Sequence, residues 1–233
     1  MHKIGSKRLA ECLDIIAEAE NRLTTIQGDQ QEFLQTDSAL KHIKGIFYRR
    51  RGELDLALTL LQECLSTRKK LGESHVVADS LNNIGIIYAS KGEFKQAIGH
   101  LLESLGMFEK FGNKPQIAKL QNNIGMIYWQ MGQINQALEY YHKGLAISEA
   151  IQDKRCKGTL LSNIGLINWH KGELDSALDY CQKALNLFSE LDSQGEIATC
   201  YNNIGIIYEI KGELDIALEF HQKGLRVEQY RLP

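Results

Sequence analysis

Asparagine recurs at one position of the chain at intervals of 40 residues, at Asn83, Asn123, Asn163 and Asn203. A carboxamide side chain carries two N–H donors and an acceptor oxygen, so a column of them can hydrogen-bond to the backbone of an extended peptide. Asparagine inside a helix costs up to about 0.7 kcal/mol relative to alanine, so its repetition requires an offsetting gain. Three interpretations stay open: the amides hold a peptide ligand, each amide links adjacent copies, or duplication of the sequence carried the residue along passively.

Other side chains share the helical stripe of the asparagines. At 100° per residue, the stripe holds an apolar column, a column that includes Lys119, and a column that includes Gln130 and His170. Apolar side chains beside the amides would form pockets for alternate side chains of an extended ligand. Trp129 and Trp169 occupy equivalent places in successive copies and would either anchor a ligand or fill the seam between copies. The predicted groove residues are Asn83, Asn123, Asn163, Asn203, Ile86, Met126, Leu166, Ile206, Lys119, Gln130, His170, Trp129 and Trp169.

The sequence contains no constellation for catalysis or metal binding. Its seven histidines and five cysteines show neither His-x-x-x-His nor Cys-x-x-Cys spacing, the usual spacings of zinc ligands. The two glycine-rich motifs that cradle phosphates, Gly-x-x-x-x-Gly-Lys-Ser/Thr and Gly-x-Gly-x-x-Gly, are absent as well. The sequence therefore predicts a protein that is not an enzyme and that uses no cofactor or metal.

Three columns of small residues show what must position the asparagine stripe. Glycine recurs every 40 residues in two columns and alanine in a third, in register over five copies. The sequence of each copy predicts two helices, because the glycine of the second column ends the first helix and an acidic residue often begins the next one. A small residue seven positions after each alanine would let neighbouring helix backbones approach closely. The columns are Gly45, Gly85, Gly125, Gly165 and Gly205; Gly52, Gly92, Gly132, Gly172 and Gly212; and Ala57, Ala97, Ala137, Ala177 and Ala217.

The repeat boundaries follow from these columns. Five copies are predicted at about residues 38–74, 75–114, 115–154, 155–194 and 195–233. Residues 1–37 precede them and are predicted to hold a capping helix and the start of the first copy. That helix is expected over residues 6–27, with Leu9, Leu13, Ile16, Leu23 and Ile26 on its apolar side.

A family resemblance becomes specific at the motif Asn-Ile-Gly-x-Ile-Tyr, which stands at residues 83–88, 123–128 and 203–208. With an alanine twelve residues after the glycine, this pattern resembles the tetratricopeptide repeat (TPR), although the usual period of that family is about 34 residues. The longer form resembles the repeats of kinesin light chain and of the mitotic-spindle adaptors, and it covers about residues 38–230. The fourth copy departs from it, with Asn168 in place of the tyrosine.

The resemblance implies a fold and a role for the asparagines. The fold would be all-α, a right-handed superhelical α-solenoid of about five TPR helix pairs with an N-terminal capping helix. The first helices of the pairs would line its concave surface. Asn83, Asn123, Asn163 and Asn203 would then act as a ladder that holds a peptide. Asn82, Asn122 and Asn202 would point partly toward the next copy.

Composition excludes several classes of partner. The chain has 27 Lys and Arg against 29 Asp and Glu, a net charge of −2, which argues against a dedicated nucleic-acid binder. No apolar run is long enough to span a bilayer, and the basic N-terminus lacks the apolar stretch of a signal peptide. Five widely spaced cysteines, an odd number, predict free thiols in a reducing cytoplasm.

The leading hypothesis is a cytoplasmic scaffold or adaptor that holds an extended peptide or partner segment in the groove. The identity of this protein or peptide ligand does not follow from the sequence, since one fold serves many functions. One alternative is a sensory or regulatory module of a larger signalling protein. Another is self-assembly into a homo-oligomer through the uncapped fifth copy, because solenoids need a polar outer face on their terminal units.

Overall fold

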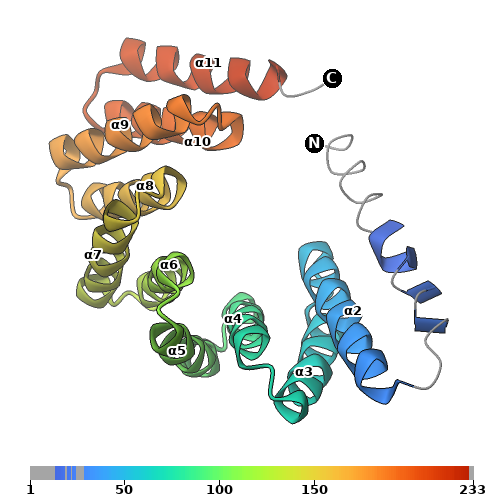
Figure 1. The fold of residues 1–233 in the computed structure, drawn as a ribbon. Helices are drawn as coiled ribbons and strands as arrows, with labels where there is room; N and C mark the ends of the chain where they lie inside the picture. Colours follow the sequence, from blue (N-terminus) through green and yellow to red (C-terminus); the bar gives the residue numbers. More distant parts are fainter. Residues whose placement is uncertain (1–13, 19, 22, 25–28, 231–233) are drawn as a thin grey trace. The chain divides into compact units, whose positions relative to one another are not determined.

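A computed structural model describes residues 14–18, 20–21, 23–24 and 29–230 of the chain. Ten helices with defined bounds follow one another in this described part, which contains no strand, and the predicted all-α fold is confirmed (Figure 1). They are α2 (Gln30–Arg51), α3 (Leu54–Leu71), α4 (Ser74–Ser90), α5 (Phe94–Phe111), α6 (Lys114–Gln130), α7 (Ile134–Ala150), α8 (Lys154–His170), α9 (Leu174–Glu190), α10 (Gln194–Ile210) and α11 (Leu214–Tyr230).

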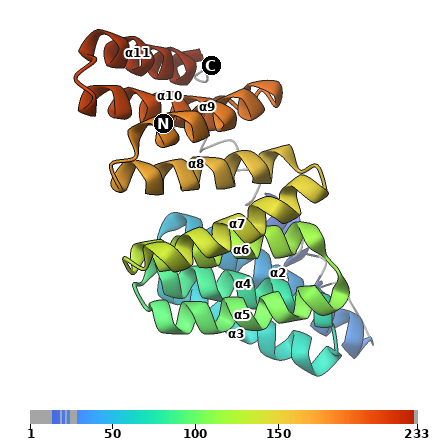
Figure 2. The same ribbon diagram turned by 90° about the vertical axis from the view of Figure 1, so that its left-hand side faces the viewer.

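The helices divide between two compact units, 1–113 and 114–233. The N-terminal unit contains the antiparallel pairs α2/α3 and α4/α5, and the C-terminal unit contains α6/α7, α8/α9 and α10/α11, which follow one another as a stack (Figure 2). Each pair is one helix–turn–helix repeat, as the glycine and alanine columns predict.

The first helices of the repeats lie on the inner side of each unit. Helix α2 contacts α4, α6 contacts α8, and α8 contacts α10. In the described residues, no such contact joins α3 to α5, α7 to α9, or α9 to α11. Because the first helices approach one another more closely than the second helices do, each stack curves toward its first helices.

The glycine at the centre of each first helix sets the crossing of the helix pair. In the third repeat, a Cβ atom on Gly125 would lie 2.6 Å from Cε1 of Tyr141 on the partner helix, closer than packed atoms allow. The same conflict occurs one helix pair earlier, where a Cβ on Gly85 would lie 2.8 Å from Cγ of Leu101. Glycine is therefore required at this position because the facing side chain fills the space of its missing Cβ.

The turns between repeats show a second regularity. Gly72 and Gly112 end the second helices of repeats one and two with φ of 72° and 66°. At the equivalent turns 40 and 80 residues after Gly112, Gln152 and Asp192 adopt φ of 57° and 48°. The backbone of these two residues therefore adopts the left-handed conformation that normally favours glycine.

The start of the chain is described in part. Helix α2 begins at Gln30, after Asp29 accepts hydrogen bonds from the backbone of Gln31 and Glu32. Of the predicted capping helix, Ile16 and Leu23 pack against the buried side of α2, which includes Phe47. Leu9, Leu13 and Ile26 lie outside the described residues.

Candidate functional site

The asparagine column occupies the first helices of four successive repeats. Asn83 lies on α4 in the N-terminal unit, and Asn123, Asn163 and Asn203 lie on α6, α8 and α10 of the C-terminal unit. All four side chains are half-buried. Because α8 contacts both α6 and α10, the last three asparagines belong to one continuous layer of helices.

The hydrogen bonds of these amides differ from repeat to repeat. Asn163 donates from Nδ2 to Oδ1 of Asn122 on the preceding first helix, at 2.8 Å. Asn83 donates to the backbone oxygen of Asp79 in its own helix, at 3.0 Å. In the described part of the chain, Asn203 has no hydrogen-bond partner. The hydrogen bond of Asn163 is therefore one example of an amide that links adjacent repeats, which is one of the interpretations left open by the sequence. The amide of Asn203 makes no hydrogen bond in the described part of the chain.

An aromatic cluster spans the third and fourth repeats beside this column. The ring of His170 lies 4.6 Å from the ring of Trp129 and 4.4 Å from that of Trp169, centroid to centroid, in edge-to-face geometry with both. His170 is exposed, whereas both tryptophans are half-buried. Both tryptophans pack against core residues, Trp129 against the cluster that includes Ile164 and Trp169 against the cluster that includes Ile204, and both contact the exposed imidazole.

A cavity of about 70 Å³ opens between α8 and α10. Its walls are predominantly apolar, and its lining combines residues of the predicted stripe with residues of the packed interior. The lining residues are Gly165, Leu166, Trp169, Cys181, Asn203, Ile206 and Ile207. Four of them, Leu166, Trp169, Asn203 and Ile206, were predicted as groove residues, and the structure brings these four together.

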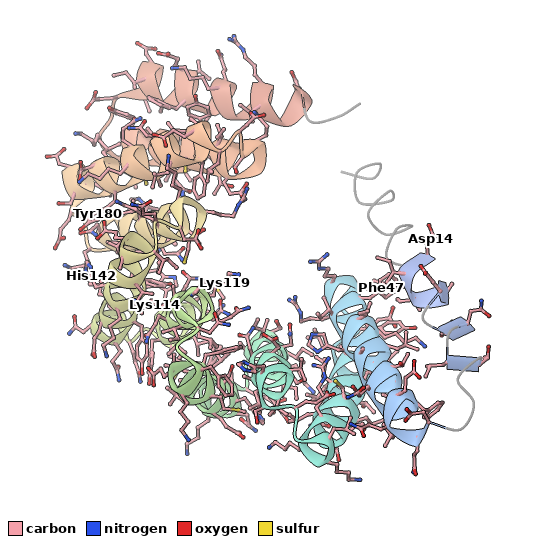
Figure 3. The ribbon with its side chains drawn as sticks, viewed as in Figure 1. Asp14, Phe47, Lys114, Lys119, His142 and Tyr180 are labelled. Carbon is pink, nitrogen blue, oxygen red and sulfur yellow. The ribbon has the colours of Figure 1, made fainter. Side chains whose placement is uncertain are left out.

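The predicted groove residues Lys119, Met126, Gln130 and Ile86 do not line this cavity. Lys119, Met126 and Gln130 are exposed on α6. Figure 3 shows Lys119 on the opposite side of the α6/α7 pair from His142, which belongs to the outer helix. Ile86 is half-buried on α4 and belongs to the N-terminal unit.

Sequence reasoning missed Cys181, which lies on α9 rather than on a first helix and is buried at the cavity. Burial raises the pKa of its thiol to about 11, so the sulfur is protonated at neutral pH and acts as an apolar surface. The predicted free thiols are found at Cys64, Cys156, Cys181 and Cys200, all of them buried, and Cys12 lies outside the described residues.

A buried polar cluster in the N-terminal unit was also missed. Arg68 is 6% exposed and its Nη1 donates to Nδ1 of His42 at 2.9 Å, to the backbone oxygen of Val76 and to Oγ of Ser80. Burial, and secondarily the Arg68 charge, lowers the pKa of His42 to about 4. The cluster links α2, α3 and α4 within the N-terminal unit.

The described residues hold no group of three or more histidine, cysteine, aspartate or glutamate side chains placed to bind a metal ion. Within the same part of the chain, no helix combines the length and the apolarity needed to cross a membrane.

The chain belongs to the tetratricopeptide repeat family, because tetratricopeptide repeat models match residues 36–110, 118–150 and 156–228, which is more than half of its length. The predicted membership is thus confirmed, and the fold is an α-solenoid of TPR helix pairs. No curated protein sequence matches the chain.

Several solved structures share the fold. BtubC (BKLC) from P. vanneervenii superposes with a TM-score of 0.75 at 16% identity, over 97% of this chain and 91% of that one. A Rap protein in complex with Competence and Sporulation Factor gives a TM-score of 0.78 at 15% identity, over 92% of this chain and 58% of that one. Kinesin light chain TPR-like repeats from Podosopora anserina give 0.65 at 16% identity, over 84% and 98%.

Proposed function

We propose that the chain is a non-catalytic scaffold or adaptor that binds an extended peptide, or an extended segment of a partner protein, along the inner surface of the C-terminal unit. The observation that carries this proposal is the layer formed by α6, α8 and α10, on which three half-buried carboxamides stand at equivalent positions beside apolar side chains. Main-chain hydrogen bonds to amides supply affinity in such a mode, and the apolar side chains supply selectivity. The TPR structure with a named factor bound, that of the Rap protein, supports a ligand on this fold.

The spacing of the helices suits an extended ligand. Packed helices lie about 8–10 Å apart, and an extended chain advances about 3.3 Å per residue, so each first helix would meet about three ligand residues. Three helices then correspond to a segment of about nine residues. Asn203 offers a free amide to such a segment, and Asn163 retains its Oδ1 acceptor while its Nδ2 is engaged by Asn122.

The test uses peptides of about nine residues selected from a random library on the wild-type chain. We expect Asn203→Ala, and the double variant Asn123→Ala with Asn163→Ala, to weaken the selected peptides by about tenfold or more, since each replaces a hydrogen-bonding amide. Asn122→Ala is the matched control, because it breaks the same Asn122–Asn163 hydrogen bond without removing a member of the column. Unchanged affinity in both asparagine variants, with helicity preserved, would contradict the proposal.

A second candidate is self-association through α11, and the exposure of its apolar residues favours it. Leu214, Leu218 and Leu225 are 66%, 57% and 58% exposed. Their equivalents one repeat earlier, Leu174, Leu178 and Leu185, pack into the core that α10 completes. Helix α11 therefore presents the same apolar side without a helix upon it in the described part of the chain, and a second copy of the chain would cover it.

A further inference from the structure

At the cavity between α8 and α10, a column of core residues that recurs in every repeat has its smallest member. The column faces the central glycine of each first helix and reads Leu61, Leu101, Tyr141, Cys181 and His221. In the other four repeats its side chain comes within 2.6–2.8 Å of where a glycine Cβ would lie, whereas Cys181 Sγ stays 3.1 Å away. Cysteine is the smallest side chain of the set, so it leaves space that leucine, tyrosine and histidine fill elsewhere.

That space is continuous with the inner surface. Gly165, Cys181 and Ile207 are buried and form the deep part of the cavity, whereas Leu166, Trp169, Asn203 and Ile206 are half-buried and lie toward solvent. One amide, that of Asn203, lies among lining residues that are otherwise apolar or weakly polar. The cavity is thus an apolar socket whose rim includes the one asparagine of the C-terminal unit's column that lacks a partner in the described residues.

Its volume limits what can enter. A dry apolar cavity of about 150 Å³ accepts benzene. At about 70 Å³, this socket is too small for an aromatic ring and large enough for a branched aliphatic group of three or four carbon atoms. Its apolar lining disfavours a charged or strongly polar side chain, which would lose its hydration without finding partners.

We propose that this socket, formed by Cys181, Gly165, Leu166 and Ile206 with Trp169 and Ile207, binds a valine- or leucine-sized side chain of the peptide, while Asn203 hydrogen-bonds to the peptide backbone beside that residue. The proposal deepens and rests on the proposed function, because it assumes an extended peptide on the inner surface. It assigns the fourth and fifth repeats a selectivity that the asparagine column alone does not provide. The thiol of Cys181 contributes shape rather than reactivity.

Capped single amino acids test the socket without any partner protein. The probes are the N-acetyl, N-methylamide derivatives of valine, leucine, alanine, phenylalanine and tryptophan, titrated into the full chain labelled with ¹³C at isoleucine and leucine methyl groups. We expect the valine and leucine probes to shift the methyl signals of Leu166, Ile206 and Ile207. The alanine probe should bind more weakly by about tenfold or more, because it buries two to three fewer carbon groups. The aromatic probes should not shift these signals.

Two variants locate the effect at the socket. Cys181→Leu places in the fourth repeat the residue that Leu61 and Leu101 supply in the first two, so it should fill the cavity, preserve the fold and abolish the shifts. Ile206→Ala should enlarge the socket and admit the phenylalanine probe. Leu138→Ala is the matched control for a general loss of packing, because Leu138 is a half-buried residue on α7 away from the cavity, and it should leave probe binding unchanged.

The outcomes separate this proposal from the proposed function. Absent shifts in the wild-type chain, equal shifts in Cys181→Leu, or stronger binding of the phenylalanine probe would each overturn the socket, even where selected peptides still depend on the asparagines. Probe binding that Cys181→Leu abolishes would support the socket. That result would stand even if the asparagine variants kept full affinity for selected peptides, in which case the peptide ladder alone would fail.

Discussion

Asn163 in the fourth repeat donates a hydrogen bond from Nδ2 to Oδ1 of Asn122 in the third, and the two atoms lie 2.8 Å apart. The bond joins α8 to α6 through side chains that are both half-buried. A residue on the candidate ligand surface therefore also fastens one repeat to the next. Asn203, at the position equivalent to Asn163, has no such bond in the described part of the chain.

This difference predicts opposite effects of the same substitution. Asn203→Ala should raise the free energy of unfolding by up to about 0.7 kcal/mol, because alanine is the better helix former and no bond is lost. Asn163→Ala should be less stable than Asn203→Ala by about 1 kcal/mol, the usual net worth of a hydrogen bond. Urea denaturation of both variants measures the difference, and a double-mutant cycle with Asn122→Ala isolates the pair. A coupling energy near zero would show that the bond does not hold the repeats together.

The turns between repeats give a second prediction. Gln152 adopts a φ of 57° where Gly72 and Gly112 stand in the earlier turns. A side chain in this region is strained against its own backbone, so Gln152→Gly should raise the free energy of unfolding by about 0.5–1 kcal/mol. Gly72→Gln is the converse control and should lower it by a similar amount. Thermal and urea unfolding of both variants measure the effect, and destabilisation by Gln152→Gly would refute it.

The repeat architecture could be predicted because it depends on spacing alone. Columns such as Gly125 with Ala137 identify helix pairs directly, since a packed glycine and a small partner recur wherever two helices cross closely. A helical wheel likewise gives the direction of each side chain, and it assigns Asn163 and Leu166 to one face of their helix.

Distances and cavities could not be predicted in the same way. A wheel does not show that Asn163 reaches Asn122, or that Asn203 makes no hydrogen bond within the described residues, because both depend on how far apart adjacent helices pack. The socket depends on Cys181, which lies on a second helix and is notable only by comparison with its column. The left-handed turn at Gln152 has no sequence signal, because its usual marker, glycine, is missing.

The buried pair of Arg68 and His42 predicts a dependence of stability on pH. Nη1 of Arg68 donates to Nδ1 of His42, so the imidazole must be neutral in the folded chain. Burial first, and then the Arg68 charge, lowers the pKa of His42 from 6.5 to about 4, so the unfolded chain binds the proton more readily. The stabilisation is full above pH 6.5 and is lost as the pH falls toward 4. Between neutral pH and about pH 5, the loss should be about 2 kcal/mol.

A substitution taken from the chain's own repeats isolates this effect. The residues equivalent to His42 in the second and third repeats are Asn82 and Asn122. His42→Asn should therefore be accommodated, keep an acceptor for Arg68 and remove the titration. Urea denaturation at the two pH values should show a smaller loss of stability in the variant than in the wild-type chain. Equal losses would mean that other groups cause the pH dependence.

The exposed side of α11 makes the last prediction. Leu218 is 57% exposed, whereas its equivalent Leu178 packs into the core completed by α10. Leu214 and Leu225 are exposed on the same side, and covering each of the three leucines is favourable by about 1.5–3 kcal/mol. Their summed burial can offset the cost of association, so the chain should self-associate as its concentration rises. Sedimentation equilibrium measures this, and Leu218→Glu should shift the association to higher concentration. Gln222→Glu is the matched control, because Gln222 and its equivalent Gln182 are both exposed and lie on the outer side of the helix. A wild-type chain that stays monomeric would exclude a second copy as the occupant of this surface. If Gln222→Glu weakened the self-association equally, then added charge, rather than loss of the apolar contact, would be what keeps the copies apart.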